Sequence, residues 1–170
     1  MKEHPPETIA DFLHRSYTAV DGLWFMMVEN ACGYDRALQL DADVWKVMPK
    51  IQARKARELL DIASNSPADL ARCFPLKFQA EGHAFEVDVS ADGVTFVVRE
   101  CHWLQLLRDS GREHLADEIG QAICSTEGVV WAEEFDGKYN FNLRRRMCAG
   151  DDCCEYVFRL QDATEAGDEG

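Results

Sequence analysis

The spacing of apolar residues predicts helices throughout the first half of the chain. Over residues 8–31 they recur every three or four positions, as on one face of a helix, and these positions are Ile9, Phe12, Leu13, Tyr17, Val20, Trp24, Met27 and Val28. A short helix over residues 34–40 follows. A third helix, capped by Asp41 or Asp43, is expected to kink or break at Pro49.

The period of the pattern changes after a fourth helix. Ser66 and Pro67 are suited to the N-cap and the first position of that helix. Residues 78–90 and 94–100 then alternate between apolar and polar side chains, and the turn over residues 91–93 joins them. This segment predicts a β-hairpin.

The rest of the chain predicts two more helices and a second hairpin. Helices are expected over residues 101–109 and 113–125, and strands over residues 140–147 and 154–160. The fold class is therefore α+β, with N-terminal helices packed on an antiparallel sheet built from two hairpins separated by helices. We expect a single α+β domain over residues 1–160.

Composition and charge narrow the classes of partner. The 170 residues are 46% hydrophobic and carry a formal net charge of −13, which opposes binding to nucleic acid or to anionic lipid. The one dense basic run, residues 144–146, is expected to form a solvated face or to pair with nearby acids, and not to bind a polyanion. Residues 161–170 are acidic and predict a disordered tail. Because no apolar stretch resembles a secretory signal or reaches membrane-spanning length, we expect a cytoplasmic protein with no membrane contact.

The seven cysteines are the first candidates for chemistry, and a cytoplasmic location predicts reduced thiols. Cys101 and His102 fall where a helix begins, a position that favours a thiolate, so we expect this pair to be catalytic if the chain is an enzyme. Cys124, Cys148 and Cys153 fall at other predicted junctions. With Cys101 they would offer soft ligands to zinc or to an iron–sulfur centre.

A simpler interpretation of the cysteines competes with the metal site. The spacing contains no CxxC pair, and cysteine is among the most buried residue types, so we favour plain burial for most of them. Cys32 and Cys73 are interpreted as packing residues, and Cys154 is the alternate to Cys153. His83, which has no nucleophile beside it in sequence, is interpreted as an ordinary surface or core residue.

A second candidate site lies on the first predicted helix. Asp21 next to Trp24 could have a raised pKa and contact a ligand, together with Trp103. Asp21 could equally pair with an arginine such as Arg54 or Arg57. The sequence contains none of the common nucleotide-binding or hydrolase motifs.

Two stretches resemble known families. Tyr17-Thr-Ala-Val-Asp-Gly-Leu-Trp24, continuing through residues 33–38 and 43–54, is similar to a family of uncharacterised bacterial and archaeal cytosolic proteins. The second half, with Cys101 at a helix start and Cys148-Ala-Gly-Asp-Asp-Cys153 before the last strand, resembles the L-2-amino-thiazoline-4-carboxylate hydrolase-like and 4-vinyl reductase-type domains. The resemblance implies an α+β fold with a cysteine-lined ligand or metal site, and it transfers no activity.

Three functions follow as hypotheses. The first is a sensor-like domain that binds a small molecule or a metal in a pocket lined by residues 24–27 and Trp103. The second is a hydrolase that opens a cyclic C–N bond, with Cys101 as nucleophile or metal ligand and His102 as proton shuttle. The third is an interaction protein in which the long N-terminal helix forms a homodimer face.

Overall fold

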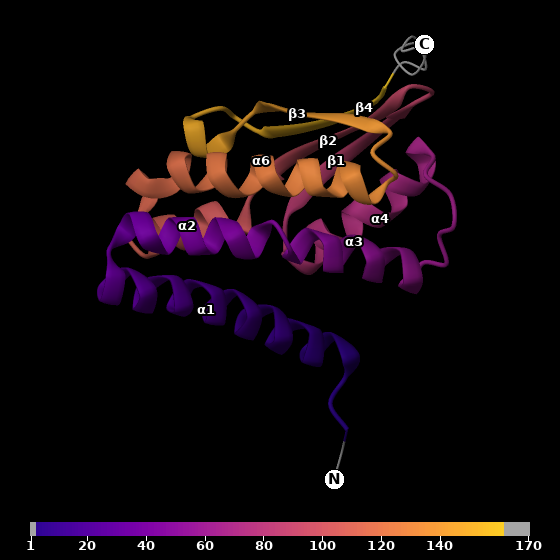
Figure 1. Cartoon of the computed structure of the whole chain (residues 1–170). Helices are drawn as coiled ribbons and strands as arrows, with labels where there is room; N and C mark the ends of the chain where they lie inside the picture. Colours follow the sequence, from indigo (N-terminus) through magenta and orange to yellow (C-terminus); the bar gives the residue numbers. More distant parts are fainter. Residues whose placement is uncertain (1–2, 162–170) are drawn as a thin grey trace. The chain divides into compact units, whose positions relative to one another are not determined.

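The computed structural model describes residues 3–161 and divides the chain into two compact units, which meet in sequence between Val44 and Trp45 (Figure 1). The sequence predicts a single domain over residues 1–160, and the structure divides this stretch into the two units. The predicted disordered tail lies outside the described residues, apart from Gln161.

The first unit consists of α1 (Pro6–Cys32) and nearly all of α2 (Tyr34–Trp45). Gly33 joins the two helices with a φ of 87°, a value that L-residues with a side chain rarely adopt, and the Phe25 and Tyr34 rings meet edge to face across this turn. The prediction that Asp41 or Asp43 caps the next helix is wrong. Helix α2 continues through both residues to Trp45, and the break between helices lies at residues 46–47, just before Pro49.

The second unit begins with two helices; the first starts later than predicted, and the second starts at Pro67, as predicted. Helix α3 (Met48–Leu59) carries Pro49 in its first turn, where proline is tolerated, so Pro49 starts the helix and does not kink it. Helix α4 (Pro67–Ala80) is capped as predicted: the Asp69 N–H donates to Ser66 Oγ at 3.2 Å. The strand predicted from residue 78 begins only after α4 ends.

The four strands form one antiparallel sheet, in the order β1-β2-β4-β3. The first hairpin, β1 (Ala84–Ser90) and β2 (Gly93–Glu100), turns through two residues because Ser90 pairs with Gly93. The second hairpin consists of β3 (Tyr139–Arg145) and β4 (Cys154–Leu160), and β2 pairs with β4 to join the hairpins. The predicted α+β class and the antiparallel sheet of two hairpins separated by helices are confirmed.

Helices connect the two hairpins. Helix α5 (His102–Asp109) is followed by a 3₁₀ turn (Glu113–Leu115) and by α6 (Ala116–Glu134). The prediction that the second of these helices ends near residue 125 is wrong. Helix α6 continues through Gly128, which packs directly under the Phe141 ring of β3, and this close approach offsets the low helix propensity of glycine.

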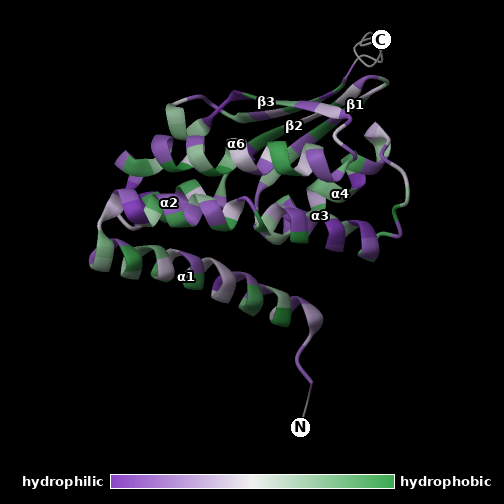
Figure 2. Ribbon diagram, viewed as in Figure 1, coloured by the Kyte–Doolittle hydropathy of each residue, from purple (hydrophilic) through white to green (hydrophobic). Residues whose placement is uncertain are grey.

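The core of the second unit lies between the sheet and two of its helices. Helices α4 and α6 cover one face of the sheet, and α3 packs against both (Figure 1). Phe74 of α4 is fully buried, and its ring lies 4.8–5.3 Å from those of Phe78, Phe96, Trp131 and Phe158. Figure 2 shows the apolar residues that β2 contributes to this core. Such a cluster of buried aromatic rings supplies a large share of the apolar area that stabilises a unit of this size.

The basic run of residues 144–146 is neutralised by local acids, as predicted. Arg144 pairs with Glu155, Arg145 with Asp152 and Arg146 with Asp117. Over the described part of the chain, every helix is too short or too polar to span a lipid bilayer.

Candidate functional site

A cluster of three charged side chains is buried inside the second unit, between α4 and α6. Lys77 Nζ lies 2.7 Å from Glu127 Oε2 and 3.0 Å from Glu81 Oε2. Lys77 lies in the last turn of α4, Glu81 is the C-cap residue four positions later, and Glu127 faces both from α6. All three side chains are at most 5% exposed. Removing such charges from water costs several kcal/mol per ion, so their burial calls for an explanation beyond stability.

Two further side chains approach Glu81 from the loop after α4 and from α5. Trp103 Nε1 donates a hydrogen bond of 3.2 Å to Glu81 Oε2, and His83 Nε2 lies 3.5 Å from the same oxygen. The backbone N–H of His102 donates to His83 Nδ1 at 3.3 Å. Because Nδ1 accepts that bond, the proton of a neutral His83 belongs on Nε2, where it faces Glu81.

Each carboxylate of the cluster has one oxygen that is still able to accept hydrogen bonds. Glu81 Oε1 and Glu127 Oε1 are buried and receive no hydrogen bond from any donor within residues 3–161. The other oxygens of the two carboxylates contact Lys77, Trp103 and His83: Glu81 Oε2 contacts all three, and Glu127 Oε2 contacts Lys77. Because buried acceptors are nearly always satisfied, two such oxygens in one cluster mark a place where a donor is required.

The cluster holds a proton that is exchangeable near neutral pH. Burial raises the pKa of Glu127 to about 7, and the neighbouring Glu81 carboxylate acts in the same direction, while Lys77 opposes both. Burial lowers the pKa of Lys77, but the attraction of Glu127 and Glu81 is greater, so the net effect raises it and keeps the ammonium charged. Chemically, the site offers a fixed cation and a carboxyl group that ionises near neutrality.

Two cysteines and a tyrosine border this cluster. Cys124 lies on α6 one turn before Glu127, and its thiol forms a hydrogen bond with the Tyr156 hydroxyl. Burial, then the charges of Glu127 and Cys101, raise the pKa of Cys124. Burial also raises the pKa of Tyr156. Both groups are therefore neutral hydrogen-bonding groups at physiological pH.

The structure places Cys101 where it was predicted, as the N-cap of α5. The N–H groups of Leu104 and Trp103 lower the pKa of its thiol as expected for a helix start, but the effect of burial is greater and raises it. His102 directs its backbone N–H to His83. The position thus favours a thiol at Cys101 over the thiolate expected from the sequence.

The four cysteines predicted as metal ligands lie on different segments of the second unit: Cys101 before α5, Cys124 in α6, Cys148 in the 3₁₀ turn after β3 and Cys153 just before β4. Cys124 lies within α6 and not at its end, because that helix is longer than predicted. Cys148 packs against Gly120 of α6. The charges of Arg145 and Arg99 act on Cys153, and the backbone N–H of Met147 donates to Cys154 Sγ at 3.3 Å. Within residues 3–161, no three His, Cys, Asp or Glu side chains are grouped so that they could hold a metal ion.

The other predicted ligand-binding residues lie in different units. Asp21 and Trp24 are on α1 in the first unit, and Trp103 is on α5 in the second. Trp103 belongs to the charged cluster of the second unit, and its ring also packs edge to face on Trp45 at 6.4 Å. Arg54, considered as a partner of Asp21, forms a two-bond ion pair with Glu134.

The sequence did not single out Lys77, Glu81 or Glu127, although one signal was available. Glu127 lies four residues after Ile123 and four before Trp131, so it falls on the apolar face of α6. Lys77 likewise lies four residues after Cys73 and three after Phe74, on the apolar face of α4. A charged residue on an apolar helix face indicates a buried pair. His83, interpreted as an ordinary surface or core residue, has a buried side chain next to Glu81.

Comparisons with known proteins identify a family and no activity. The model of a family of unknown function (DUF6125) matches residues 2–160, which is nearly the whole chain. A search of curated proteins found no match. The chain therefore belongs to this family of unknown function.

Proposed function

We propose that this member of DUF6125 is a small-molecule-binding protein, and that its ligand donates N–H hydrogen bonds to the buried carboxylates of Glu81 and Glu127. The observation that carries the proposal is the pair of open oxygens, Glu81 Oε1 and Glu127 Oε1, held in a buried cluster. A binding site commonly combines an apolar lining with a few convergent polar groups. Here the lining is aromatic, since Phe78 and Trp103 lie against the cluster.

The charge of the cluster indicates the class of ligand. With Glu127 ionised, two carboxylates face the single ammonium of Lys77. A ligand that carries a primary ammonium group would supply both the missing charge and the missing donors. Because Glu127 ionises at about pH 7, such a ligand is expected to bind more tightly above neutrality than below it.

The test uses two probes of equal charge: methylammonium has three N–H donors, and the bulkier tetramethylammonium has none. Methylammonium and tetramethylammonium chloride are titrated at equal ionic strength above neutral pH, and the unfolding temperature is measured. Methylammonium should raise it more than tetramethylammonium does, and Glu127→Gln and Glu81→Gln should abolish the difference. Glu133→Gln, at an exposed position of the same helix, is the matched control and should retain it. Equal responses to both probes in the wild type would refute the proposal.

Binding is favoured over the hydrolase alternative by the state of Cys101. A ring-opening hydrolase of the kind that the second half of the sequence resembles would need a nucleophilic thiolate with a base at hand. Burial works against that ionisation at Cys101. A zinc or iron–sulfur centre on Cys101, Cys124, Cys148 and Cys153 stays a separate prediction, checked by metal analysis of protein purified without chelator.

A further inference from the structure

The helix α1 carries one face of exposed apolar side chains. Leu13, Val20 and Met27 are seven residues apart, and Ser16 and Leu23 lie between them at the three- and four-residue steps of a heptad repeat. The α1 stripe consists of these positions and the residues that flank them on the same side: Phe12, Leu13, Ser16, Ala19, Val20, Leu23, Met26 and Met27, all of which are exposed.

The opposite face of the same helix is the one that packs. Thr18 and Phe25, also seven residues apart, are the buried residues of α1, and Phe25 meets Tyr34 of α2 within the first unit. Helix α1 is therefore apolar on two sides. The α1 stripe leaves an apolar face exposed, an arrangement that a solvent-exposed helix does not need.

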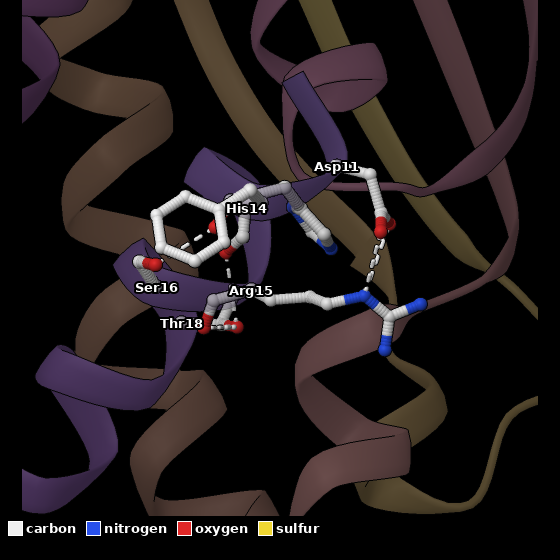
Figure 3. Close-up of polar contacts among 6 residues, drawn as sticks. Asp11, His14, Arg15, Ser16 and Thr18 are labelled. Atoms are coloured by element: carbon white, nitrogen blue, oxygen red, sulfur yellow. Dashed lines mark hydrogen bonds and ion pairs between the residues drawn. The ribbon is translucent and has the colours of Figure 1, made fainter. Parts of the chain in front are cut away.

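The polar groups on and beside the stripe have partners within α1. Figure 3 shows Ser16 Oγ, which donates to the Phe12 carbonyl oxygen at 2.8 Å, so this hydroxyl can be covered without losing a hydrogen bond. Arg15 Nε donates to both carboxylate oxygens of Asp11 at 3.0 and 2.9 Å, at the border of the stripe. The stripe itself contains no charged residue.

We infer that the α1 stripe pairs with the α1 stripe of a second copy of this chain, forming a two-fold symmetric dimer. The large apolar side chains of the α1 stripe, counted together with Ile9 and Trp24, are 40–69% exposed. Their exposed area is on the order of 900 Å², and each partner of a standard interface buries roughly 800 Å². A heptad of apolar residues over this length is the pattern by which helices pack against one another. The small residues Ser16 and Ala19 near its centre allow two helices to approach closely.

A lipid surface fits the same face less well. Helices that lie on membranes are rich in Lys and Arg on their polar side. Arg15 is the single Lys or Arg of α1, which carries the acids Glu7, Asp11, Asp21 and Glu29. The net charge of −13 acts in the same direction.

The experiment measures molar mass by light scattering over a hundredfold range of concentration. The wild-type chain should give twice its mass of 19.3 kDa, and the unpaired carboxylates of Leu13→Glu and Val20→Glu should weaken the dimer by more than about 100-fold. Leu59→Glu, at a 67% exposed position of α3, is the matched control and should leave the dimer intact. Circular dichroism checks that each variant stays folded.

Three results would overturn the inference. The first is a wild-type monomer at every concentration. The second is a dimer that Leu59→Glu weakens as much as Val20→Glu. The third is a monomer that binds phosphatidylcholine vesicles through the α1 stripe, which would assign the face to lipid. None of these results bears on Glu81 and Glu127, so the dimer and the proposed ligand site fail independently.

Discussion

The buried position of Glu127 predicts a stability that falls as the pH rises through neutrality. Its pKa is raised from an ordinary 4.5 to about 7 in the folded protein. The folded state therefore holds this proton more tightly than the unfolded state does. The resulting stabilisation is complete below about pH 4.5 and is lost as the pH rises through about 7.

The magnitude follows from the linkage between pKa and free energy. One pKa unit corresponds to about 1.4 kcal/mol, so the change from 4.5 to about 7 is worth about 3 kcal/mol. Glu127→Gln removes the titration while keeping the shape and the neutral state of the side chain. The free energy of unfolding of the wild type, minus that of Glu127→Gln, should fall by about 3 kcal/mol between about pH 5 and pH 8.

Urea unfolding in the presence of a reductant, followed by circular dichroism and by tryptophan fluorescence, measures both free energies across this range. Glu133→Gln is the control for charge removal on the same helix, and its difference from the wild type should stay flat. A difference between wild type and Glu127→Gln that is constant with pH would refute the reasoning. A difference that rises with pH would show that the attraction of Lys77 exceeds the cost of burial and lowers the pKa.

Three further predictions concern packing and reactivity. Gly128→Ala should lower the free energy of unfolding by about 1–3 kcal/mol, because its Cβ would overlap the Phe141 ring. Gly22→Ala, with open space around it, should instead raise helix stability by up to about 1 kcal/mol. Urea unfolding compares the two variants, and equal effects would contradict the packing at Gly128. Phe74→Ala should cost about 3–5 kcal/mol in the same assay, and a loss below about 1 kcal/mol would mean that the aromatic cluster is not the core. Cys101 should react with iodoacetamide more slowly than free cysteine at neutral pH and regain the free rate in urea, as peptide mass spectrometry would show, since burial raises its pKa.

Much of the fold could be predicted from local signals because those signals are physical causes of the structure. Ser66 caps α4 through its own side chain, and the alternation over β2 sets which of its residues are buried. The errors fall where tertiary contacts decide. Helix α6 passes the predicted stop because Phe141, distant in sequence, accommodates Gly128.

The candidate site could be predicted only in part, for the same reason. Cys101 was correctly placed at the start of α5, because a helix boundary is a local property. Its ionisation was predicted in the wrong direction, since burial depends on the packing of the second unit. Lys77 and Glu127 are fifty residues apart in sequence and pair across two helices, and no spacing along the chain predicts such a partner.

The pairing of β2 with β4 also bears on how the chain folds. Each hairpin closes a short loop and can form early, whereas the pairing of Val98 with Cys154 closes a long loop that contains α5, α6 and β3. Closing a loop of this length carries a large entropic cost before any contact compensates for it, and long-range strand pairing of this kind slows folding. We therefore expect the central β2–β4 ladder to be the last part of the sheet to form and, once formed, the part whose amides exchange most slowly with solvent.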